Sequence, residues 1–180
     1  MRRKILVATG LGAVVLGIGA FMFMGSVEKN APTEIDAQSI KKMVHGYSTD
    51  ILTAKSASIT SKQLIVTEND EQSSTYDLPD NEFFLSIAPY VDQTHPCATH
   101  SLTGCQGEMV EKEFNVNIKD EDGSVIVDEK MKSQSNGFID LWLPRDTKYS
   151  ITVEHDGKTA ESEISTFETD DTCLTTMQLG

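Results

Sequence analysis

Hydrophobic and polar positions divide the chain into one unbroken apolar segment and a longer remainder in which they alternate. Residues 5–25 carry no charge and directly follow Arg2, Arg3 and Lys4. A helix of this length reaches about 30 Å, which is the thickness of the hydrocarbon core of a bilayer. We therefore predict an N-terminal membrane or signal helix over residues 1–26, with its basic end in the cytoplasm and the rest of the chain outside.

The end of this apolar segment bears on whether it is a membrane anchor or a cleaved signal peptide. Signal peptides have a shorter apolar stretch, roughly 7–15 residues, and small residues at the cleavage site. Here the bulky residues Phe21 to Met24 stand where small ones are needed. The pattern favours a retained anchor, followed by a polar stalk over residues 27–33. The protein is then extracytoplasmic, in the periplasm or on the outer face of the cytoplasmic membrane.

Residues 34–91 combine a helical period with strand patterns. Between residues 34 and 55, apolar side chains at helical spacing predict one helix with a buried face: Ile40, Met43, Val44, Tyr47 and Ile51. Residues 56–78 are typical of a β-hairpin, with a polar turn at residues 68–74. Residues 82–91 contain a continuous apolar run that Pro89 stops, which predicts a buried strand. We expect this region to be a small α+β unit.

Residues 92–180 show the strand period more clearly. Short alternating runs predict a hairpin around residues 120–123, a strand at 138–143, a second hairpin around Asp156 and Gly157, and a last strand at 174–179. Several short strands separated by turns favour an antiparallel β-sandwich-like domain. The whole chain is therefore predicted to be α+β, with the N-terminal membrane or signal helix preceding a small α+β region and this C-terminal domain.

Charge and motifs exclude several classes of function. Among 180 residues the chain has 15 Lys and Arg against 28 Asp and Glu, a formal net charge of -13. Repulsion between this acidic chain and phosphate groups argues against a nucleic-acid partner. The sequence contains no G-x-S-x-G, P-loop, H-E-x-x-H or C-x-x-C motif, so nothing indicates a hydrolase, a nucleotide-binding protein or a thioredoxin-like enzyme. We do not predict an enzyme.

The chemistry-bearing residues gather in one glycine-containing loop. Residues 95–109 hold two histidines, two cysteines and a methionine: His95, Cys97, His100, Cys105 and Met109. The third cysteine, Cys173, lies near the C-terminus and is followed by Met177. Thiolate and thioether ligands select Cu(I), whereas imidazole also accepts Cu(II) and zinc. A site of this composition outside the cytoplasm predicts copper as the bound metal, with Cu(I) preferred.

A structural disulfide is the alternative interpretation of the same cysteines. In an oxidising compartment Cys105 could pair with Cys173, or Cys97 with Cys105, and fasten the loop to the sheet. An odd cysteine count leaves one thiol unpaired in either case, and a free thiol outside the cell favours a chemical role. The other two histidines, His45 and His155, are interpreted as ordinary packing or surface residues.

Several segments together resemble the CueP family of periplasmic copper-binding proteins. They are residues 84–90, 95–97, 100–109, 137–144 and 171–177, within a similarity that spans nearly all of residues 34–180. The resemblance implies an exported protein that binds copper through Cys97, Cys105 and Cys173. It also implies reduction of Cu(II) to Cu(I) and donation of copper to a secreted enzyme such as a copper–zinc superoxide dismutase. His95, His100, Met109 and Met177 are further candidate ligands, chosen from their chemistry alone.

Three cysteines permit a redox hypothesis. Two thiolates can each give one electron to Cu(II) and become a disulfide, while the remaining thiolate holds Cu(I) with a neighbouring cysteine, His or Met. The disulfide then needs an extracytoplasmic thiol reductant, because the compartment itself favours oxidation. Two other classes of function stay open: a metal-free thiol–disulfide protein, with Cys97 or Cys105 as the reactive thiol, and a β-sandwich interaction module with a structural disulfide.

Overall fold

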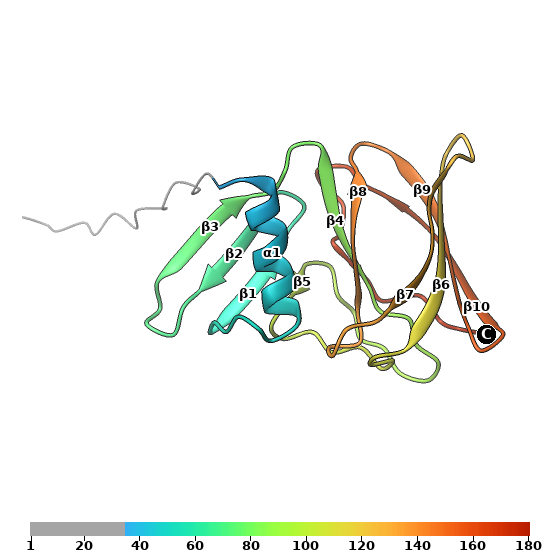
Figure 1. The fold of residues 1–180 in the computed structure, drawn as a ribbon, viewed down its shortest axis with the longest axis horizontal. Helices are drawn as coiled ribbons and strands as arrows, with labels where there is room; N and C mark the ends of the chain where they lie inside the picture. The colour runs from blue at the N-terminus through green and yellow to red at the C-terminus, as the bar shows by residue number, and fades with distance from the viewer. Residues whose placement is uncertain (1–34) are drawn as a thin grey trace, which may run out of the picture.

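The computed structural model describes residues 35–180, which contain one short helix and three small β-sheets (Figure 1). The β-rich character predicted from the alternating pattern is confirmed. The predicted anchor over residues 1–26 and the stalk over residues 27–33 lie outside the described residues. Within residues 35–180, no helix is both long enough and apolar enough to cross a bilayer.

Helix α1 (Ala37–Ser48) is shorter than the predicted span of residues 34–55. Its N-cap Asp36 accepts a hydrogen bond from the backbone N–H of Ser39, which satisfies one of the free donors of the first turn. The helix ends because Asp50 adopts a positive φ of 58°, a conformation that cannot continue a right-handed helix. The buried face contains the predicted Ile40, Val44 and Tyr47, but Ile51 lies beyond the helix and is exposed.

The first sheet packs against this helix and has the strand order β3-β2-β1-β5. Strands β1 (Ser56–Ile59), β2 (Gln63–Thr67) and β3 (Ser73–Asp77) pair antiparallel, so two hairpins occupy the region where one was predicted. The fourth strand, β5 (His100–Ser101), comes from the Cys/His loop and pairs with the outer side of β1. Its pairing therefore carries part of that loop into the first sheet.

The central sheet has the order β11-β4-β8 and is covered on both faces. Strand β4 (Glu82–Ile87) pairs antiparallel with β8 (Ile139–Pro144) and parallel with β11 (Cys173–Leu174). Successive side chains of a strand point to opposite faces. Phe84 accordingly lies in the core shared with α1 and the first sheet, whereas Phe83 and Leu85 lie in the main core on the other side. This explains the continuous apolar run in β4.

The third sheet covers the main core and has the order β10-β9-β6-β7. Its strands are β6 (Glu113–Asp120), β7 (Val125–Lys132), β9 (Lys148–His155) and β10 (Lys158–Ser165). Figure 1 shows this sheet on one side of β4 and β8, with α1 and the first sheet on the other. Strand β4 belongs to the first predicted region but pairs with β8 and β11 of the second. Strand β5 belongs to the second predicted region but pairs with β1 of the first. The boundary near residue 91 stays a prediction.

Candidate metal centre

The three cysteines and one histidine meet where the first sheet adjoins the central sheet. His100 begins β5 and lies opposite Ile59 of β1. Cys173 begins β11 and lies opposite Ser86 of β4. Cys97 and Cys105 flank β5 in the loop on either side. Pairing of two very short strands with two different sheets thus brings together residues that are more than 70 positions apart in the chain.

We call Cys97, His100, Cys105 and Cys173 the metal centre. Their ligand atoms all lie within 4.8 Å of one another. The Sγ atoms of Cys97 and Cys105 are 3.5 Å apart, and the Sγ of Cys173 is 3.5 Å from Nδ1 of His100. All three cysteines are free thiols, so the structural disulfide considered above is not present. Three sulfur atoms and one imidazole nitrogen form a soft donor set that fits Cu(I).

The metal centre has a buried half and a half-buried one. His100 and Cys173 are buried, whereas Cys97 and Cys105 are intermediate in exposure. The Phe138 ring packs against His100, with 4.5 Å between the ring centroids. Phe138 and Ala88 also form a small apolar cluster with the three cysteines. This apolar lining excludes water from the inner side of the sulfur atoms, while the outer side stays accessible.

Thr172 fixes the backbone around the buried half. Its hydroxyl donates to the carbonyl of Ile59 (2.7 Å) and accepts from the N–H of His100 (3.1 Å). Its own N–H donates to the carbonyl of Ala98 (3.0 Å). One buried threonine therefore connects β1, the Cys/His loop and the start of β11, and places His100 beside Cys173.

A close approach of two glycines fixes the other end of the loop. The N–H of Gly107 donates to the carbonyl of Asn136 (2.7 Å). A Cβ at Gly107 would stand 2.7 Å from the backbone oxygen of Gly137, which is closer than real Cβ contacts allow. Gly137 itself has a φ of +81°, a conformation that favours glycine. The loop after Cys105 thus lies directly against the turn that precedes β8.

The three thiols differ in acidity because their hydrogen bonds differ. The pKa of Cys105 falls to about 2, chiefly through a hydrogen bond from Cys173 and against the opposing effect of burial. The backbone N–H of Ser101, which lies 3.4 Å from the Cys105 sulfur, and a hydrogen bond from His95 lower that pKa as well. Burial raises the pKa of Cys97 to about 11. The pKa of Cys173 is also raised, first by its hydrogen bond to Cys105 and second by burial. Cys105 is therefore the thiolate of the set, and the thiolate is the form that binds metals.

The structure separates the remaining candidate ligands from the metal centre. His95 is half-buried beside Phe138, with 6.4 Å between ring centroids, and acts on Cys105 through a hydrogen bond. Met109 and Met177 are only 8% and 0% exposed and pack in the main core with Phe83, a cluster that includes none of the cysteines. Roles of these three residues as ligands stay predictions.

Two polar residues behind His100 were missed by the sequence analysis. Nε2 of His100 is 3.3 Å from the hydroxyl of Ser86, and that hydroxyl donates to Asp140 at 2.6 Å. Each stands in an otherwise apolar strand, Ser86 within Phe83-Phe-Leu-Ser-Ile87 and Asp140 within Ile139-Asp-Leu-Trp-Leu143. A polar residue on a buried face of a strand needs a hydrogen-bond partner, and that signal could have identified both.

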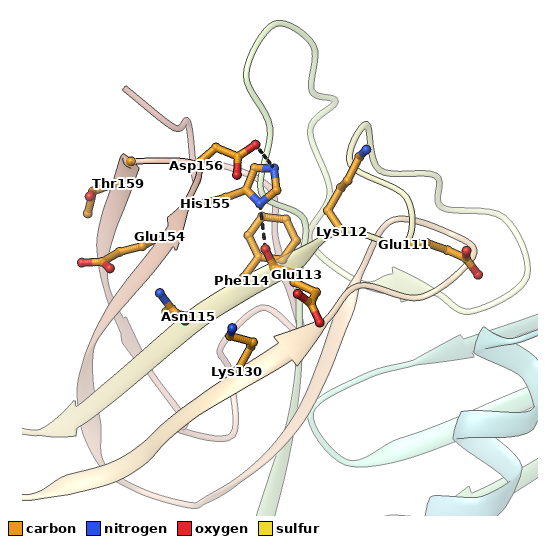
Figure 2. A pocket seen from close by; sticks show the side chains of 11 residues that line it. Glu111, Lys112, Glu113, Phe114, Asn115, Lys130, Glu154, His155, Asp156 and Thr159 are labelled. Atoms are coloured by element: carbon orange, nitrogen blue, oxygen red, sulfur yellow. Dashed lines mark hydrogen bonds and ion pairs between the residues drawn. The ribbon is translucent and has the colours of Figure 1, made fainter.

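His155 lies elsewhere, in a hollow of about 500 Å³ on the third sheet (Figure 2). Its Nδ1 is 2.7 Å from the carbonyl of Glu113, and its Nε2 is 3.4 Å from a carboxylate oxygen of Asp156. Both ring nitrogens therefore face partners within the protein. The hollow contains none of the metal-centre residues. The interpretation of His155 as an ordinary packing or surface residue stays a prediction.

Comparison with known proteins identifies the family. Residues 39–178 match the family described as periplasmic copper-binding protein CueP, and this span contains the whole metal centre. The chain is similar to the protein in the crystal structure of S.CueP, with 44% sequence identity and a TM-score of 0.73. The match covers 78% of this chain and 89% of that chain. No curated protein matches. The similarity predicted from residues 84–177 is thereby confirmed: the chain belongs to the CueP family of periplasmic copper-binding proteins.

Proposed function

We propose that this protein binds copper outside the cytoplasm through the cysteine thiolates of the metal centre and holds it as Cu(I). The observation that carries the proposal is the convergence of three free sulfur atoms and one imidazole nitrogen within 4.8 Å. Soft thiolates prefer Cu(I), and an apolar lining limits competition from water. Cys105 starts as a thiolate, so the first bond to the metal costs no proton.

A hollow of about 280 Å³ gives copper a route to the sulfur atoms. It is lined by Cys97 and Cys173 together with the carboxylate residues Asp170 and Asp171. Carboxylates in the lining attract a cation, while the sulfur atoms in the same lining select it. The net charge of -13 acts in the same direction on cations in general.

The same thiols can reduce Cu(II). One cysteine thiol and the Cys105 thiolate transfer one electron each to two Cu(II) ions, which gives two Cu(I) ions, one disulfide bond and one released proton. The third cysteine then holds one Cu(I) with His100. Cys97 and Cys105 are close enough to form such a pair after a small movement, since their sulfur atoms are 3.5 Å apart. A thiol reductant outside the cytoplasm restores the two thiols by thiol–disulfide exchange.

Transfer of copper to a secreted enzyme, such as a copper–zinc superoxide dismutase, follows from the exposure of the ligands. Cys97 and Cys105 are half-exposed and can be displaced one at a time by the ligands of a partner. The proposal includes anchoring of the protein at the outer face of the cytoplasmic membrane through residues 1–26, which would keep the exchange close to that membrane.

The test mixes the reduced full-length protein with Cu(II) and follows the formation of Cu(I) with a Cu(I)-specific chromophore. Free thiols are counted in parallel by mass spectrometry. We expect Cu(I) to appear as two thiols disappear. Cys105→Ser should lose reduction, because it removes one member of the Cys97–Cys105 pair. Cys173→Ser should lose tight Cu(I) binding, because it removes the sulfur that holds Cu(I) with His100. His155→Ala is the matched control, because His155 lies outside the metal centre. Intact reduction and binding in both serine variants would overturn the proposal.

A metal-free thiol–disulfide protein is the second candidate function. It is favoured by one observation, the low pKa of Cys105 beside the sulfur of Cys97, since a reactive thiol pair needs an accessible thiolate. Elemental analysis of protein purified from copper-supplemented cells separates the two candidates. Copper should co-purify with a copper-binding protein, whereas a thiol–disulfide protein should be free of metal.

A further inference from the structure

A chain of hydrogen bonds leads from the metal centre into the central sheet. Ser86 on β4 and Asp140 on β8 are directly opposite each other in the strand register, so both side chains lie on the face toward His100. Ser86 and His100 are both 0% exposed. The links are 3.3 Å from His100 Nε2 to Ser86 Oγ and 2.6 Å from Ser86 Oγ to Asp140 Oδ1.

The direction of these hydrogen bonds follows from the number of available protons. The carboxylate of Asp140 is an acceptor, and its other oxygen receives hydrogen bonds from Ser48 Oγ (2.7 Å) and Gln134 Nε2 (3.2 Å). The single hydroxyl proton of Ser86 is therefore given to Asp140. The oxygen of Ser86 can then only accept, so Nε2 of His100 must carry the proton that it donates.

A proton on Nε2 leaves the lone pair of a neutral imidazole on Nδ1. Nδ1 is the atom that lies 3.5 Å from the Sγ of Cys173, within the cluster of ligand atoms. The rings of Phe138 and Phe84 stand beside the imidazole, with 4.5 Å and 6.2 Å between centroids, and limit its rotation. The nitrogen with the free lone pair is thus the one that faces the three sulfur atoms.

We propose that Ser86 and Asp140 are positioning residues that hold His100 in the Nε2–H tautomer, so that Nδ1 is the nitrogen offered to copper. The inference rests on the proposed function, because it assigns a role within the copper site. Histidine ligands generally donate their second ring N–H to a carboxylate or similar acceptor, which fixes their orientation. Here a serine hydroxyl stands between the histidine and the carboxylate.

The experiment first determines the tautomer of His100 without metal. The reduced full-length protein is labelled with 15N-histidine, its ring nitrogens are assigned with His100→Ala, and long-range 1H–15N NMR identifies the protonated nitrogen. We expect Nε2–H in the wild type and in Ser86→Thr, which keeps a hydroxyl. In Ser86→Ala and in Asp140→Ala we expect a mixture of tautomers. The ring signals of His155, which lies outside the metal centre, should be the same in every variant.

Competition with a chromophoric Cu(I) chelator then measures affinity in the same proteins. We expect Ser86→Ala to bind Cu(I) about 10-fold more weakly, as for other residues that support a metal ligand, and Ser86→Thr to restore most of the loss. If Ser86→Ala does not fold, Asp140→Ala carries the same comparison. A wild-type Nδ1–H tautomer, or unchanged affinity in a folded variant whose tautomer has changed, would overturn the inference. A wild type that binds no Cu(I) would instead overturn the proposed function. The NMR measurement without metal would still show whether Ser86 and Asp140 hold His100 in the Nε2–H tautomer.

Discussion

Replacing Thr172 by valine tests whether the metal centre depends on the hydrogen bonds that hold its backbone. Valine has the shape of threonine but no hydroxyl, so the change removes two interactions and little volume. The carbonyl of Ile59 loses its donor at 2.7 Å, and the N–H of His100 loses its acceptor at 3.1 Å. Thr172 is 1% exposed, so water cannot readily replace the hydroxyl.

The cost can be estimated from these two groups. A buried polar group left without its partner costs about 1–3 kcal/mol, so we expect the loss of two partners to lower the free energy of unfolding of Thr172→Val by about 2–6 kcal/mol. Cu(I) affinity should fall as well, by about 10-fold, because His100 is no longer held beside Cys173 by its backbone. Urea unfolding followed by the fluorescence of Trp142, the single tryptophan of the chain, measures the first quantity. Chelator competition measures the second.

Thr166→Val is the matched control. Thr166 is 0% exposed, and its hydroxyl donates to Pro144 O (2.9 Å) and accepts from Thr147 N–H (3.2 Å). None of its hydrogen-bond partners belongs to the metal centre. Its replacement should therefore cost a similar amount of stability but leave Cu(I) affinity unchanged. The reasoning is refuted if Thr172→Val is as stable as the wild type, or if both variants lose the same amount of affinity.

Three further predictions concern the loop and its thiols. At pH 5 the thiol of Cys105, whose pKa is about 2, is ionised, whereas the thiol of Cys97, whose pKa is about 11, is not. Iodoacetamide should therefore modify Cys105 before Cys97, and this order should vanish when urea unfolds the protein. Bound Cu(I) should protect all three cysteines from alkylation, and one that stays reactive in mass spectra would contradict a three-sulfur site. Gly107→Ala should lower the free energy of unfolding by about 1–3 kcal/mol in urea titrations, because its Cβ would stand 2.7 Å from Gly137 O; an unchanged midpoint would refute that close approach.

The elements that the sequence predicted well are those determined by neighbouring residues. The turn after β6 contains Gly123 and the turn after β9 contains Asp156 and Gly157, all with positive φ. These residues favour such turns, and the alternation on either side fixes which face of each strand is buried. The two hairpins of the third sheet could therefore be predicted from short stretches of sequence alone.

The two strands that build the metal centre could not be predicted in this way. Strands β5 and β11 have two residues each, which is too short to show a period. They exist because β1 and β4 offer edges to pair with, and those edges come from elsewhere in the chain. The last strand, predicted at residues 174–179, is reduced to Cys173–Leu174 and an isolated bridge between Tyr90 and Gln178.

For the candidate ligands, too, the sequence shows the chemistry of each side chain but not its surroundings in the fold. Side-chain chemistry selected the three cysteines and His100, and the structure brings these four together. The same chemistry selected Met109 and Met177, although both pack in the main core. A thioether is equally suited to a soft metal and to an apolar core, and only the three-dimensional arrangement shows which surroundings it has. Ser86 and Asp140 depend on the register between β4 and β8, which sequence spacing does not reveal.

The position of the metal centre between two sheets links copper binding to the packing of the whole domain. His100 is held by the first sheet, and Cys173 is held by the central sheet, so a metal bound to both crosslinks them. Asp140 extends this link to α1, because it also accepts from Ser48 at the end of that helix. A ligand that binds only the folded state stabilises it, by about 2.7 kcal/mol at a concentration 100 times the Kd. Because the ligands come from both sheets, that stabilisation should act on the contact between the sheets and not on the loop alone.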